Sequence, residues 1–461
     1  MLKCVSPIDN SIYVERPYAT DDQIAQALES ATNAAQAWRK TSLADRAALC
    51  TALIDDFVST PDRHAEELAR QMGRPIRYGA GEVNGFAERA RCMIDLAEEA
   101  LGDVPLPAKP GIKRFIRRDP LGVWLTVAPW NYPFLTAVNS IIPALMAGNA
   151  VILKHSHQTP LCGERMVESG QAAGLPEGLF QFLHLTRDQT AQLIKSPKIN
   201  GVAFTGSVAG GVDIEQAAAG RFIPVGLELG GKDPAYVRAD ANVAFAVENL
   251  VDGSFFNSGQ SCCGIERIYV HDDVYDEFIA GFADLTREYV LGDPMDPATT
   301  LGPMVRTSAA DFVRGQIAEA VEAGAQALIN PSLFSADKAD SPYLAPQVLV
   351  NVDHSMRIMT EESFGPVVGI MKVSSDEEAI TLMNDSDLGL TASIWSSDEE
   401  VALALGDRIE TGTVFMNRCD YLDPELAWTG VKDTGRGCSL SSLGYDQLTQ
   451  AKSFHYRVKI D

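Results

Sequence analysis

Positive charge, cysteine and histidine are scarce in this sequence of 461 residues. It contains 8 cysteines and 7 histidines, and none follows a C-x-x-C or Cys/His spacing typical of zinc, so no metal site is predicted. Lysine and arginine together number 38 against 62 acidic residues, which gives a formal net charge of −24. Because an acidic surface repels polyanions, this balance argues against nucleic acid and anionic membranes as partners.

A secretory signal is also missing from the first residues, MLKCVSPIDN, which lack a basic segment followed by an apolar one. The cysteines are scattered, apart from the adjacent pair Cys262 and Cys263. Sparse, scattered cysteines favour free thiols in a reducing compartment. We therefore expect a cytoplasmic protein.

Residues 120–153 carry no charged side chain, and this length alone would allow a membrane span. However, Pro129, Pro133 and Pro143 interrupt the stretch, and a helix in lipid tolerates such interruptions poorly. We expect a strand, a loop, a helix and a second strand, all buried inside a soluble protein.

The chain is too long for one compact core, so two or three domains are expected. The first hundred residues have helical patterns. Short apolar runs then alternate with helical patterns in two series, over residues 121–231 and 242–417. Such alternation predicts parallel, doubly wound sheets with helices on both faces. Two polar alternating segments, at 112–119 and 453–460, are typical of edge strands that pair as an arm.

Three loops at the ends of predicted strands carry candidate functional groups, because ligands of open α/β sheets bind at the carboxyl ends of the strands. The first, AFTGS (203–207), opens a helix, where the N–H groups of Gly206 and Ser207 could hold a phosphate. Strand–glycine–helix junctions without ligands are common, so this loop alone leaves a structural role open.

The second loop, GLELGGKDP (226–234), places Glu228 at the end of an apolar strand. A carboxylate that loses hydration there gains a raised pKa and becomes a useful base. A residue that only faces a solvated edge is the alternative.

The third loop, FFNSGQSCCG (255–264), places Cys262 among glycines and polar residues. Flanking backbone N–H groups can stabilise a thiolate nucleophile there, whereas most single cysteines are packing residues. The neighbouring Cys263 leaves open a redox-sensing pair, although vicinal disulfides are strained.

Six motifs together resemble the aldehyde dehydrogenase superfamily. In chain order they are APWNYP (128–133), PALMAGNAVILKHS (143–156), FTGS (204–207), LELGGKDP (227–234), GQSC (259–262) and EESFGPVV (361–368). Their order and approximate spacing are those of the superfamily, and the similarity spans nearly the whole chain. The length and the pair Lys154-His155 are most similar to the short, succinate-semialdehyde-dehydrogenase-like branch.

The resemblance implies an α/β fold of the aldehyde dehydrogenase type. It comprises a Rossmann-like cofactor-binding domain (1–101 and 121–230), a catalytic α/β domain (231–440) and a β-strand oligomerisation arm (102–120 and 441–461). The arm implies exchange of strands between subunits and hence a homodimer or homotetramer.

The resemblance also implies an NAD(P)-dependent oxidation of an aldehyde to its acid. Cys262 is the nucleophile, and the oxyanion is received by the Asn131 side-chain amide and the backbone N–H of Cys262. Glu228 activates the water that hydrolyses the thioester. Branches that transfer the acyl group to coenzyme A generally lack this glutamate, so hydrolysis is favoured here.

NAD or NADP is the cofactor that the resemblance implies. Lys154 is expected at the adenosine ribose, Gly206 and Ser207 at the pyrophosphate, and Glu362 and Phe364 around the nicotinamide. The full set assigned to the cofactor cleft is Trp130, Lys154, Ser156, His157, Gly206, Ser207, Leu229, Glu362 and Phe364. Strict NAD users carry glutamate three residues after the lysine, where this chain has His157. Since a carboxylate there would repel a 2′-phosphate, we expect NADP to be accepted.

The substrate prediction depends on residues that line the entry tunnel in relatives, namely Phe134, Phe256, Tyr421 and Trp428. They indicate an apolar or aromatic small-molecule aldehyde. Many succinate semialdehyde enzymes have arginines where this chain has Asn139 and Phe256, but Arg418 could supply one cation. A succinate-semialdehyde dehydrogenase therefore stays as an alternative. Two alternatives of another class are a catalytically silent structural relative and the vicinal-cysteine redox sensor.

Overall fold

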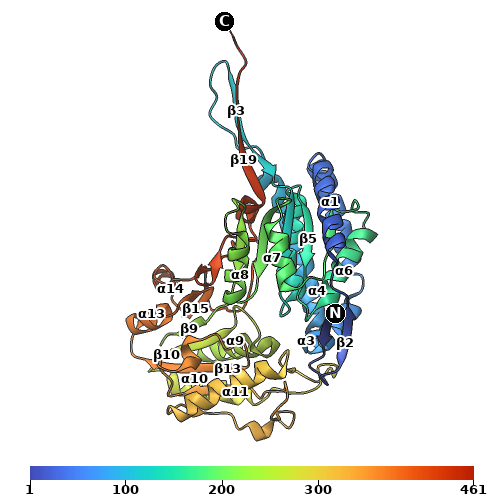
Figure 1. The fold of residues 1–461 in the computed structure, drawn as a ribbon. Coiled ribbons are helices and arrows are strands. Elements are labelled where there is room, and N and C mark those ends of the chain that lie inside the picture. Colours follow the sequence, from blue (N-terminus) through green and yellow to red (C-terminus); the bar gives the residue numbers. More distant parts are fainter. Residues whose placement is uncertain (461) are drawn as a thin grey trace.

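Two parallel-stranded sheets and a projecting two-stranded arm make up the computed structural model, which describes residues 1–460 (Figure 1). The first sheet has the order β18-β8-β7-β4-β5-β6. Its strands are β4 (Val123–Val127), β5 (Ala150–Lys154), β6 (Phe180–Phe182), β7 (Ile199–Thr205), β8 (Val225–Glu228) and the antiparallel β18 (Gly435–Arg436). The parallel sheet predicted for this region is confirmed.

Eight helices accompany the first sheet in the described part of the chain. They are α1 (Asp21–Trp38), α2 (Leu43–Phe57), α3 (Pro61–Met72), α4 (Gly79–Leu101), α5 (Pro133–Met146), α6 (Pro160–Ala172), α7 (Arg187–Lys195) and α8 (Val208–Ala218). α1 begins with a capping box, in which Thr20 and Gln23 exchange side-chain-to-backbone hydrogen bonds. Apolar side chains from these helices and from the sheet form one continuous buried cluster.

The uncharged stretch at 120–153 folds as predicted into β4, a loop, α5 and β5, nearly all of it buried. Pro143 lies inside α5, and Asn149 ties the turn before β5 by accepting a hydrogen bond from Gly122 N at 2.9 Å. Among residues 1–460, no helix is both long and apolar enough to span a bilayer.

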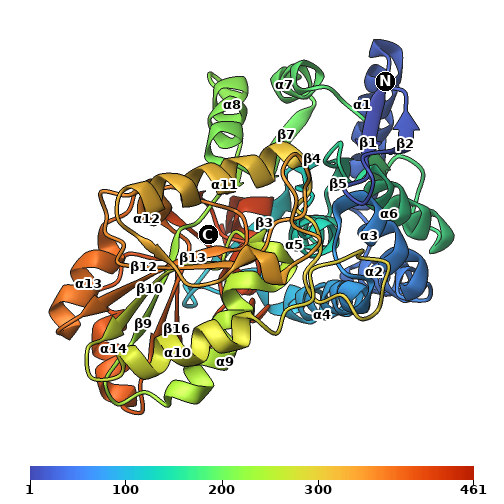
Figure 2. The ribbon, with the colours of Figure 1, turned by 90° about the horizontal axis from the view of Figure 1, so that it is seen from below.

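The second sheet has the order β11-β12-β13-β10-β9-β15-β16. Its strands are β9 (Asp233–Val237), β10 (Ile265–His271), β11 (Gln326–Ala327), β12 (Gln347–Val350), β13 (Val367–Val373), β15 (Thr391–Trp395) and β16 (Thr413–Met416). Its helices are α9 (Val243–Phe255), α10 (Tyr275–Thr286), α11 (Thr307–Glu322), α12 (Arg357–Thr360), α13 (Asp376–Asn384) and α14 (Glu399–Gly406). Figure 2 shows α11 on one side of the strands and α9 with α10 on the other. Two separate apolar clusters fill the two faces, so this sheet is also doubly wound.

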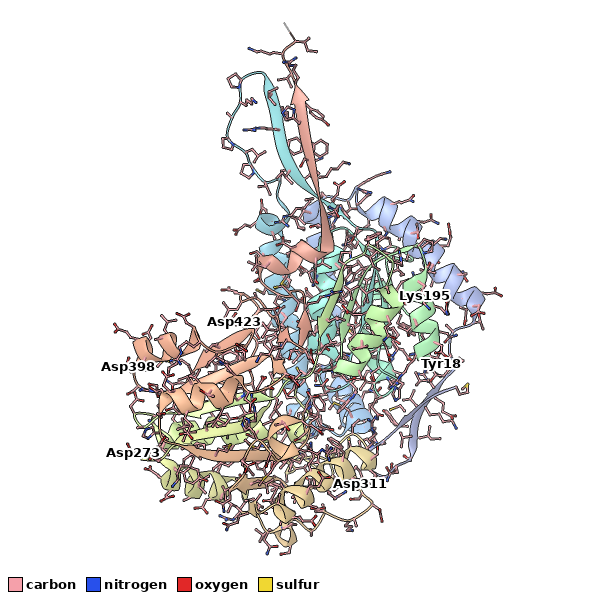
Figure 3. The ribbon with its side chains drawn as sticks, turned by 60° about the vertical axis from the view of Figure 1, so that its left-hand side comes forward. Tyr18, Lys195, Asp273, Asp311, Asp398 and Asp423 are labelled. Atoms are coloured by element: carbon pink, nitrogen blue, oxygen red, sulfur yellow. The ribbon has the colours of Figure 1, made fainter. Side chains whose placement is uncertain are left out.

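Acidic residues lie mainly at the periphery. Figure 3 labels Asp273, Asp311 and Asp398 on the outside of the second unit, which fits the net charge of −24.

The arm consists of β3 (Ile112–Pro120) and β19 (Thr449–Arg457), paired antiparallel over their whole length. The predicted pairing of these two segments is confirmed, although β19 begins four residues before the expected start at 453. Figure 1 shows the arm extending away from both units. The rings of Phe115 and Phe454 stack with centroids 4.6 Å apart, which supports a ribbon with little other packing. Asp461, the last residue of the expected arm, lies outside the described residues.

Several expectations need correction. A hairpin, β1 (Leu2–Val5) with β2 (Ile12–Arg16), precedes the helices, because Cys4 and Val14 bury themselves against Leu161. The short pair β14 (Leu388–Gly389) and β17 (Val431–Lys432) was also not predicted.

The chain returns to the first unit earlier than the predicted boundary at 440. β18 pairs with β8 of the first sheet, and the 3₁₀ segment η4 (Ser442–Leu448) packs on α4 and α5 rather than joining the arm. Tyr445, which is fully buried in η4, donates a hydrogen bond to the Met93 carbonyl at 2.5 Å.

Candidate active site

A cavity of about 500 Å³ lies where the two units meet. Its lining includes Thr205, Glu228 and Cys262, one from each of the three loops that the sequence analysis selected. Thr205 and Glu228 stand at the carboxyl ends of β7 and β8, and Cys262 precedes β10. Residues far apart in the chain are thus brought to one cavity by the edges of two sheets.

Cys262 is half-buried and lies in the loop after the 3₁₀ segment η2 (Phe256–Gly259). Within η2, Asn257 and Ser258 adopt left-handed φ angles of 54° and 57°, which cost energy for residues other than glycine. Tertiary hydrogen bonds hold them: Asn257 Nδ2 donates to the Asn131 carbonyl at 3.1 Å, and Ser258 Oγ donates to that of Gly302 at 2.8 Å. The strained loop therefore presents Cys262 to the cavity in a fixed orientation.

Asn131 lies beside this loop, before the first turn of α5. Its side-chain Nδ2 donates to the Gln260 carbonyl at 3.1 Å, and its own carbonyl accepts from Arg74 at 2.6 Å. An amide nitrogen carries two hydrogens, so one remains for a ligand. The Asn131 amide is thus oriented by the same loop that carries Cys262.

Glu228 ends β8 with its carboxylate in the cavity. Ser439 Oγ donates to one carboxylate oxygen at 2.5 Å and Thr205 Oγ1 to the other at 3.2 Å. Burial raises the pKa of Glu228, and the two hydroxyl donors offset only part of this rise. A carboxylate in this setting is a stronger base than one in water, as its place at an apolar strand end predicts.

Cys263 differs from its neighbour, because it is buried and its Sγ donates to Asp420 Oδ1 at 3.0 Å. Its pKa is raised well above the usual thiol value by the hydrogen bond with Cys262, by burial and by Asp420. Ser261 Oγ donates to the same Asp420 oxygen at 2.8 Å. The two adjacent sulfurs are free thiols, and Cys263 is held protonated.

Aromatic side chains line part of the cavity. Three of the four residues predicted there, Phe256, Tyr421 and Trp428, do line it. Phe134 does not: its ring packs in the core at 4.9 Å from the Phe57 ring. Successive positions on α5 point about 100° apart, so the next residue, Leu135, faces the cavity instead.

Charged side chains also line the cavity, and the sequence analysis did not assign them there. Arg74 forms a buried ion pair with Glu82. Arg89 on α4 donates from Nη1 to the Leu135 carbonyl at 2.9 Å. Arg418, which could have supplied one cation for the substrate, instead stacks with its guanidinium carbon 3.4 Å from the centre of the Tyr421 ring and does not line the cavity.

Lys154 ends β5 among other positively charged side chains. Burial and the nearby Arg187 lower its pKa to about 8. Loss of hydration to neighbouring atoms also lowers the pKa of His157, with the positive charges of Lys154, Arg306 and Arg187 adding to the effect. No carboxylate lies within 4.0 Å of the Lys154 ammonium in the described part of the chain. Ser156 accepts a hydrogen bond from Gln158 N at 3.2 Å and shapes the turn between them.

The two glycine-loop residues differ from expectation. The backbone N–H of Gly206 is already used, because it donates to the Glu228 carbonyl at 3.0 Å as β7 and β8 continue their ladder. This N–H is therefore not free for a phosphate, and a place of Gly206 at the cofactor stays a prediction. Ser207 is the N-cap of α8, where its Oγ accepts from Gly210 N at 3.2 Å. The first turn of this helix is the remaining anion-binding element of the loop.

Glu362 binds the glycine loop after β8. Its Oε1 accepts from Gly231 N at 3.1 Å, and burial raises its pKa to about 8. The Trp130 and Phe364 rings meet edge to face at 5.7 Å. Leu229 lies between the cavity and α8, where a side chain at Gly211 would collide with it.

These groups fit a nicotinamide dinucleotide in their chemistry. They offer a cation without a counter-ion at Lys154, the amino end of α8, the acid Glu362 and the aromatic pair Trp130 and Phe364. A dinucleotide needs such groups for its phosphates, ribose hydroxyls and rings.

Sequence reasoning missed Asp420 and Arg89. Asp420 follows β16, so the rule that ligands meet the carboxyl ends of strands points to it. Arg89 lies three residues from the buried Phe86 on α4, and helical spacing places it at the rim of the buried face. Nothing local shows that this rim faces a cavity.

The family and the three known proteins described here, to which this chain is similar, are all named as aldehyde or semialdehyde dehydrogenases. A family model described as the aldehyde dehydrogenase family matches residues 1–454. An aldehyde dehydrogenase of Paenarthrobacter nicotinovorans is 36% identical over 437 residues, which is 94% of this chain and 95% of the relative. A succinate-semialdehyde dehydrogenase [NADP(+)] of Mycobacterium avium is 35% identical over 90% of this chain and 87% of its own. The crystal structure of the succinic semialdehyde dehydrogenase of Streptococcus pyogenes with NADP⁺ superposes with a TM-score of 0.94, at 32% identity over 98% of this chain and 99% of that one.

Proposed function

The chain belongs to the aldehyde dehydrogenase family, and we propose from this premise that Cys262, Glu228 and Asn131 perform its chemistry. The resemblance drawn from six motifs is confirmed, as are the α/β fold and the enzyme class. The protein is an aldehyde dehydrogenase that uses NAD or NADP. The assignment of individual residues is our proposal.

The single observation that carries the proposal is the shared cavity of Cys262 and the strengthened base Glu228. In the first step, Cys262 Sγ gives its proton to solvent water and attacks the aldehyde carbon. Negative charge develops on the substrate oxygen, where the free Asn131 amide hydrogen and the Cys262 N–H stabilise it. One such donor is typically worth about 3 kcal/mol.

The cofactor supplies a hydride acceptor when it is bound. Lys154, the first turn of α8 and Glu362 would hold it beside Cys262. Cys262 then carries the acyl group as a thioester.

Glu228 completes the reaction by accepting a proton from water. The hydroxide attacks the thioester carbon, the carbon–sulfur bond breaks, and the acid leaves while Cys262 returns as a thiolate. The raised pKa of Glu228 supports this role, since it makes the carboxylate a better proton acceptor. Transfer of the acyl group to coenzyme A needs no such base and is disfavoured.

NADP is the cofactor that the charges around Lys154 favour. The cation without a counter-ion at Lys154, the nearby Arg187 and the lack of an acid at His157 support acceptance of a 2′-phosphate. Two of the three relatives described above are named as NADP enzymes or carry NADP⁺.

For the substrate, the cavity supports two classes of small-molecule aldehyde. The walls formed by Phe256, Tyr421 and Trp428 favour an apolar or aromatic aldehyde. An aldehyde with a carboxylate, such as succinate semialdehyde, is the second candidate, because arginine side chains line the same cavity and two relatives act on it by name.

The arm supports a homodimer or homotetramer in the cytoplasm. At the end of its ladder and beyond, it exposes apolar side chains, of which Tyr456, Val458 and Ile460 are 51%, 61% and 85% exposed. Such residues gain stability when a partner covers them. All eight cysteines are free, which fits a reducing compartment.

The test is Glu228→Gln with purified enzyme, an aldehyde and NADP, followed by the absorbance of reduced nicotinamide. We expect a burst of one turnover per site, because acylation of Cys262 survives the substitution. The steady turnover that follows should be about 100-fold slower than in the parent enzyme, because hydrolysis of the thioester lacks its base. Glu361→Gln is the matched control, since Glu361 is an exposed neighbour of the site paired with Arg357. Steady turnover within a few-fold of the parent would refute the role of Glu228. Aldehyde-independent thiol loss in the parent, without reduced nicotinamide, would instead favour the redox sensor.

A further inference from the structure

Arg89 brings a positive charge to the cavity that holds Cys262. It projects from α4, and its Nη1 donates to the Leu135 carbonyl at 2.9 Å and to Asn139 Oδ1 at 3.4 Å. Both partners belong to α5 and are uncharged. The residue lines the cavity together with Cys262 and Glu228.

No carboxylate compensates this charge directly. Within residues 1–460, no carboxylate oxygen lies within 4.0 Å of a guanidinium nitrogen of Arg89. Two other arginines line the cavity: Arg74 is neutralised by Glu82, and Arg77 is exposed to solvent. Two neutral hydrogen bonds use only one of the three guanidinium nitrogens, so donors remain for an anion.

The other charged groups around the cavity make a cation necessary for an acidic substrate. Glu88, Asp252 and Asp420 line the same space. Burial raises the pKa of Asp420, and burial together with Asp420 raises that of Asp252 to about 6. A substrate carboxylate that entered here would be repelled unless a positive group faced it. Arginine is suited to this task because its planar fork binds a carboxylate through two parallel hydrogen bonds.

We propose that Arg89 binds the carboxylate of a short aldehyde acid and thereby determines the substrate class. This inference depends on the proposed function, since it requires the aldehyde group to reach Cys262. The apolar walls then enclose the methylene chain between the two ends of the substrate. Arg89 is a specificity-determining residue and takes no part in bond making.

The experiment compares succinate semialdehyde with butanal, which carries a methyl group in place of the carboxylate. kcat/KM is measured for both aldehydes with the parent enzyme, Arg89→Gln and Arg91→Gln. Arg91 lies on the same helix but pairs with Asp55 at the surface, which makes it the matched control. A third variant combines Arg89→Gln with Asn139→Arg. It places an arginine close to the position of the one removed, because Asn139 Oδ1 lies 3.4 Å from Arg89 Nη1.

We expect the parent enzyme to prefer succinate semialdehyde. Arg89→Gln should lower the ratio of the two kcat/KM values by about 10- to 100-fold, mainly through KM, because a charged hydrogen-bonded pair is lost. Arg91→Gln should leave this ratio within twofold, and Asn139→Arg should restore part of it in the Arg89→Gln background.

Three results would overturn the inference. The first is a parent enzyme that favours butanal, a result that can be measured without any variant. Arg89→Gln could lower both kcat/KM values equally and move the pH profile, which would make Arg89 the counter-ion of Glu228. The ratio could also stay unchanged. A parent enzyme that oxidises no aldehyde at all would contradict the proposed function itself, so the two failures are distinguishable.

Discussion

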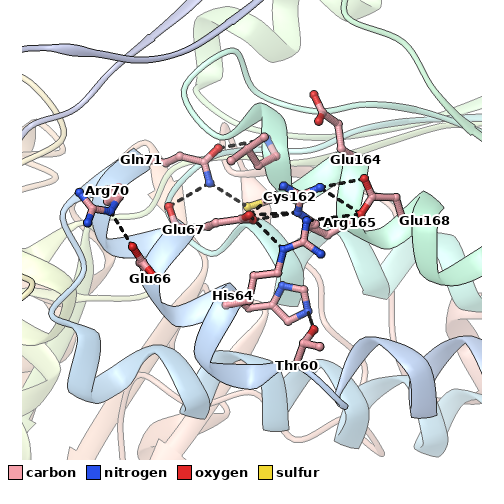
Figure 4. Close-up of polar contacts among 12 residues, drawn as sticks. Thr60, His64, Glu66, Glu67, Arg70, Gln71, Cys162, Glu164, Arg165 and Glu168 are labelled. Atoms are coloured by element: carbon pink, nitrogen blue, oxygen red, sulfur yellow. Dashed lines mark hydrogen bonds and ion pairs between the residues drawn. The ribbon is translucent and has the colours of Figure 1, made fainter.

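Charged side chains are buried both between α3 and α6 and around the active-site cavity, but the two places differ in the partners that these side chains bind. Between the helices, Glu67 accepts hydrogen bonds from Arg63 at 3.3 Å and from Arg165 at 2.8 Å, and Arg165 also binds Glu168 at 2.8 Å (Figure 4). Every carboxylate and guanidinium named here has a partner of opposite charge. This α3–α6 network joins two elements about a hundred residues apart in the chain.

In the cavity, the charged groups bind neutral partners instead. Glu228 accepts from two hydroxyls, Asp420 accepts from a hydroxyl and a thiol, and Arg89 donates to a carbonyl and an amide. The neutral donors and the more distant charge of Arg89 only partly offset the loss of hydration, so the pKa values of Glu228 and Asp420 are raised. Paired charges hold helices together, whereas charges without a counter-ion remain available to a proton or a substrate.

The largest effect that tests this difference is expected when one charge is removed from the α3–α6 network. Glu67→Gln leaves Arg165, whose side chain is 13% exposed, with only the half-exposed Glu168. We expect the free energy of unfolding to fall by about 3 kcal/mol, because a buried cation loses its partner. The midpoint of denaturant unfolding, followed by circular dichroism, measures this loss, and kcat should not change.

The control for Glu67→Gln is Glu66→Gln on the same helix. Glu66 pairs with Arg70 at 2.9 Å, but both side chains are exposed, so the loss should stay below about 1 kcal/mol. If the two variants lowered stability equally, or if Glu67→Gln lowered kcat, the division into structural and reactive charges would be wrong.

The sequence predicted the sheets well where each strand is a buried apolar run. β4 and β15 are buried on both faces and have few polar residues, so their periodicity is local information. β9 was missed because it begins with Asp233, which reads as a loop residue. Its carboxyl is buried and accepts a hydrogen bond from Thr391 Oγ1 at 2.5 Å, a partner 158 positions away. Such a pairing has no local signal.

The site was predictable in part for the same reason. Cys262 and Glu228 lie in motifs with glycines that the backbone requires, so the sequence marks them. The choice between Phe134 and Leu135 as a cavity residue depends on how α5 packs against Phe57, which the sequence of α5 does not encode. The use of the Gly206 N–H by the Glu228 carbonyl depends likewise on the register of β7 against β8.

A smaller effect, on the pH profile of kcat, tests whether the cavity carboxylate of Glu228 takes up a proton as the comparison implies. Turnover needs Glu228 as a carboxylate, so steady kcat should fall as the pH drops through the raised pKa of Glu228, above the range of an ordinary glutamate. Ser439→Ala removes the donor at 2.5 Å that favours the charged form. The raised pKa then rises further, and the acid limb of the kcat profile should move to higher pH by about one to two units.

The control for this shift is Ser441→Ala. Ser441 is close in sequence, but its Oγ accepts from Leu443 N and does not contact Glu228. An acid limb that stayed in place in Ser439→Ala, or moved to lower pH, would contradict the assignment of Glu228 as the group that titrates.

The smallest effect is expected when the proposed cofactor site is given an ion pair, as in the α3–α6 network. His157→Glu places a carboxylate near Lys154 and Arg187, the cations that lower the pKa of His157. The new carboxylate would pair with Lys154 and repel a 2′-phosphate, and each pair of unit charges 4 Å apart in water is worth about 1 kcal/mol. The ratio of kcat/KM for NADP to that for NAD should therefore fall by about tenfold, and raising the salt concentration should reduce this difference. His157→Gln, which adds no charge, separates repulsion from the loss of the imidazole. If His157→Gln changed the ratio as much as His157→Glu, charge would not govern the choice of cofactor, and Lys154 would belong with the paired, structural groups.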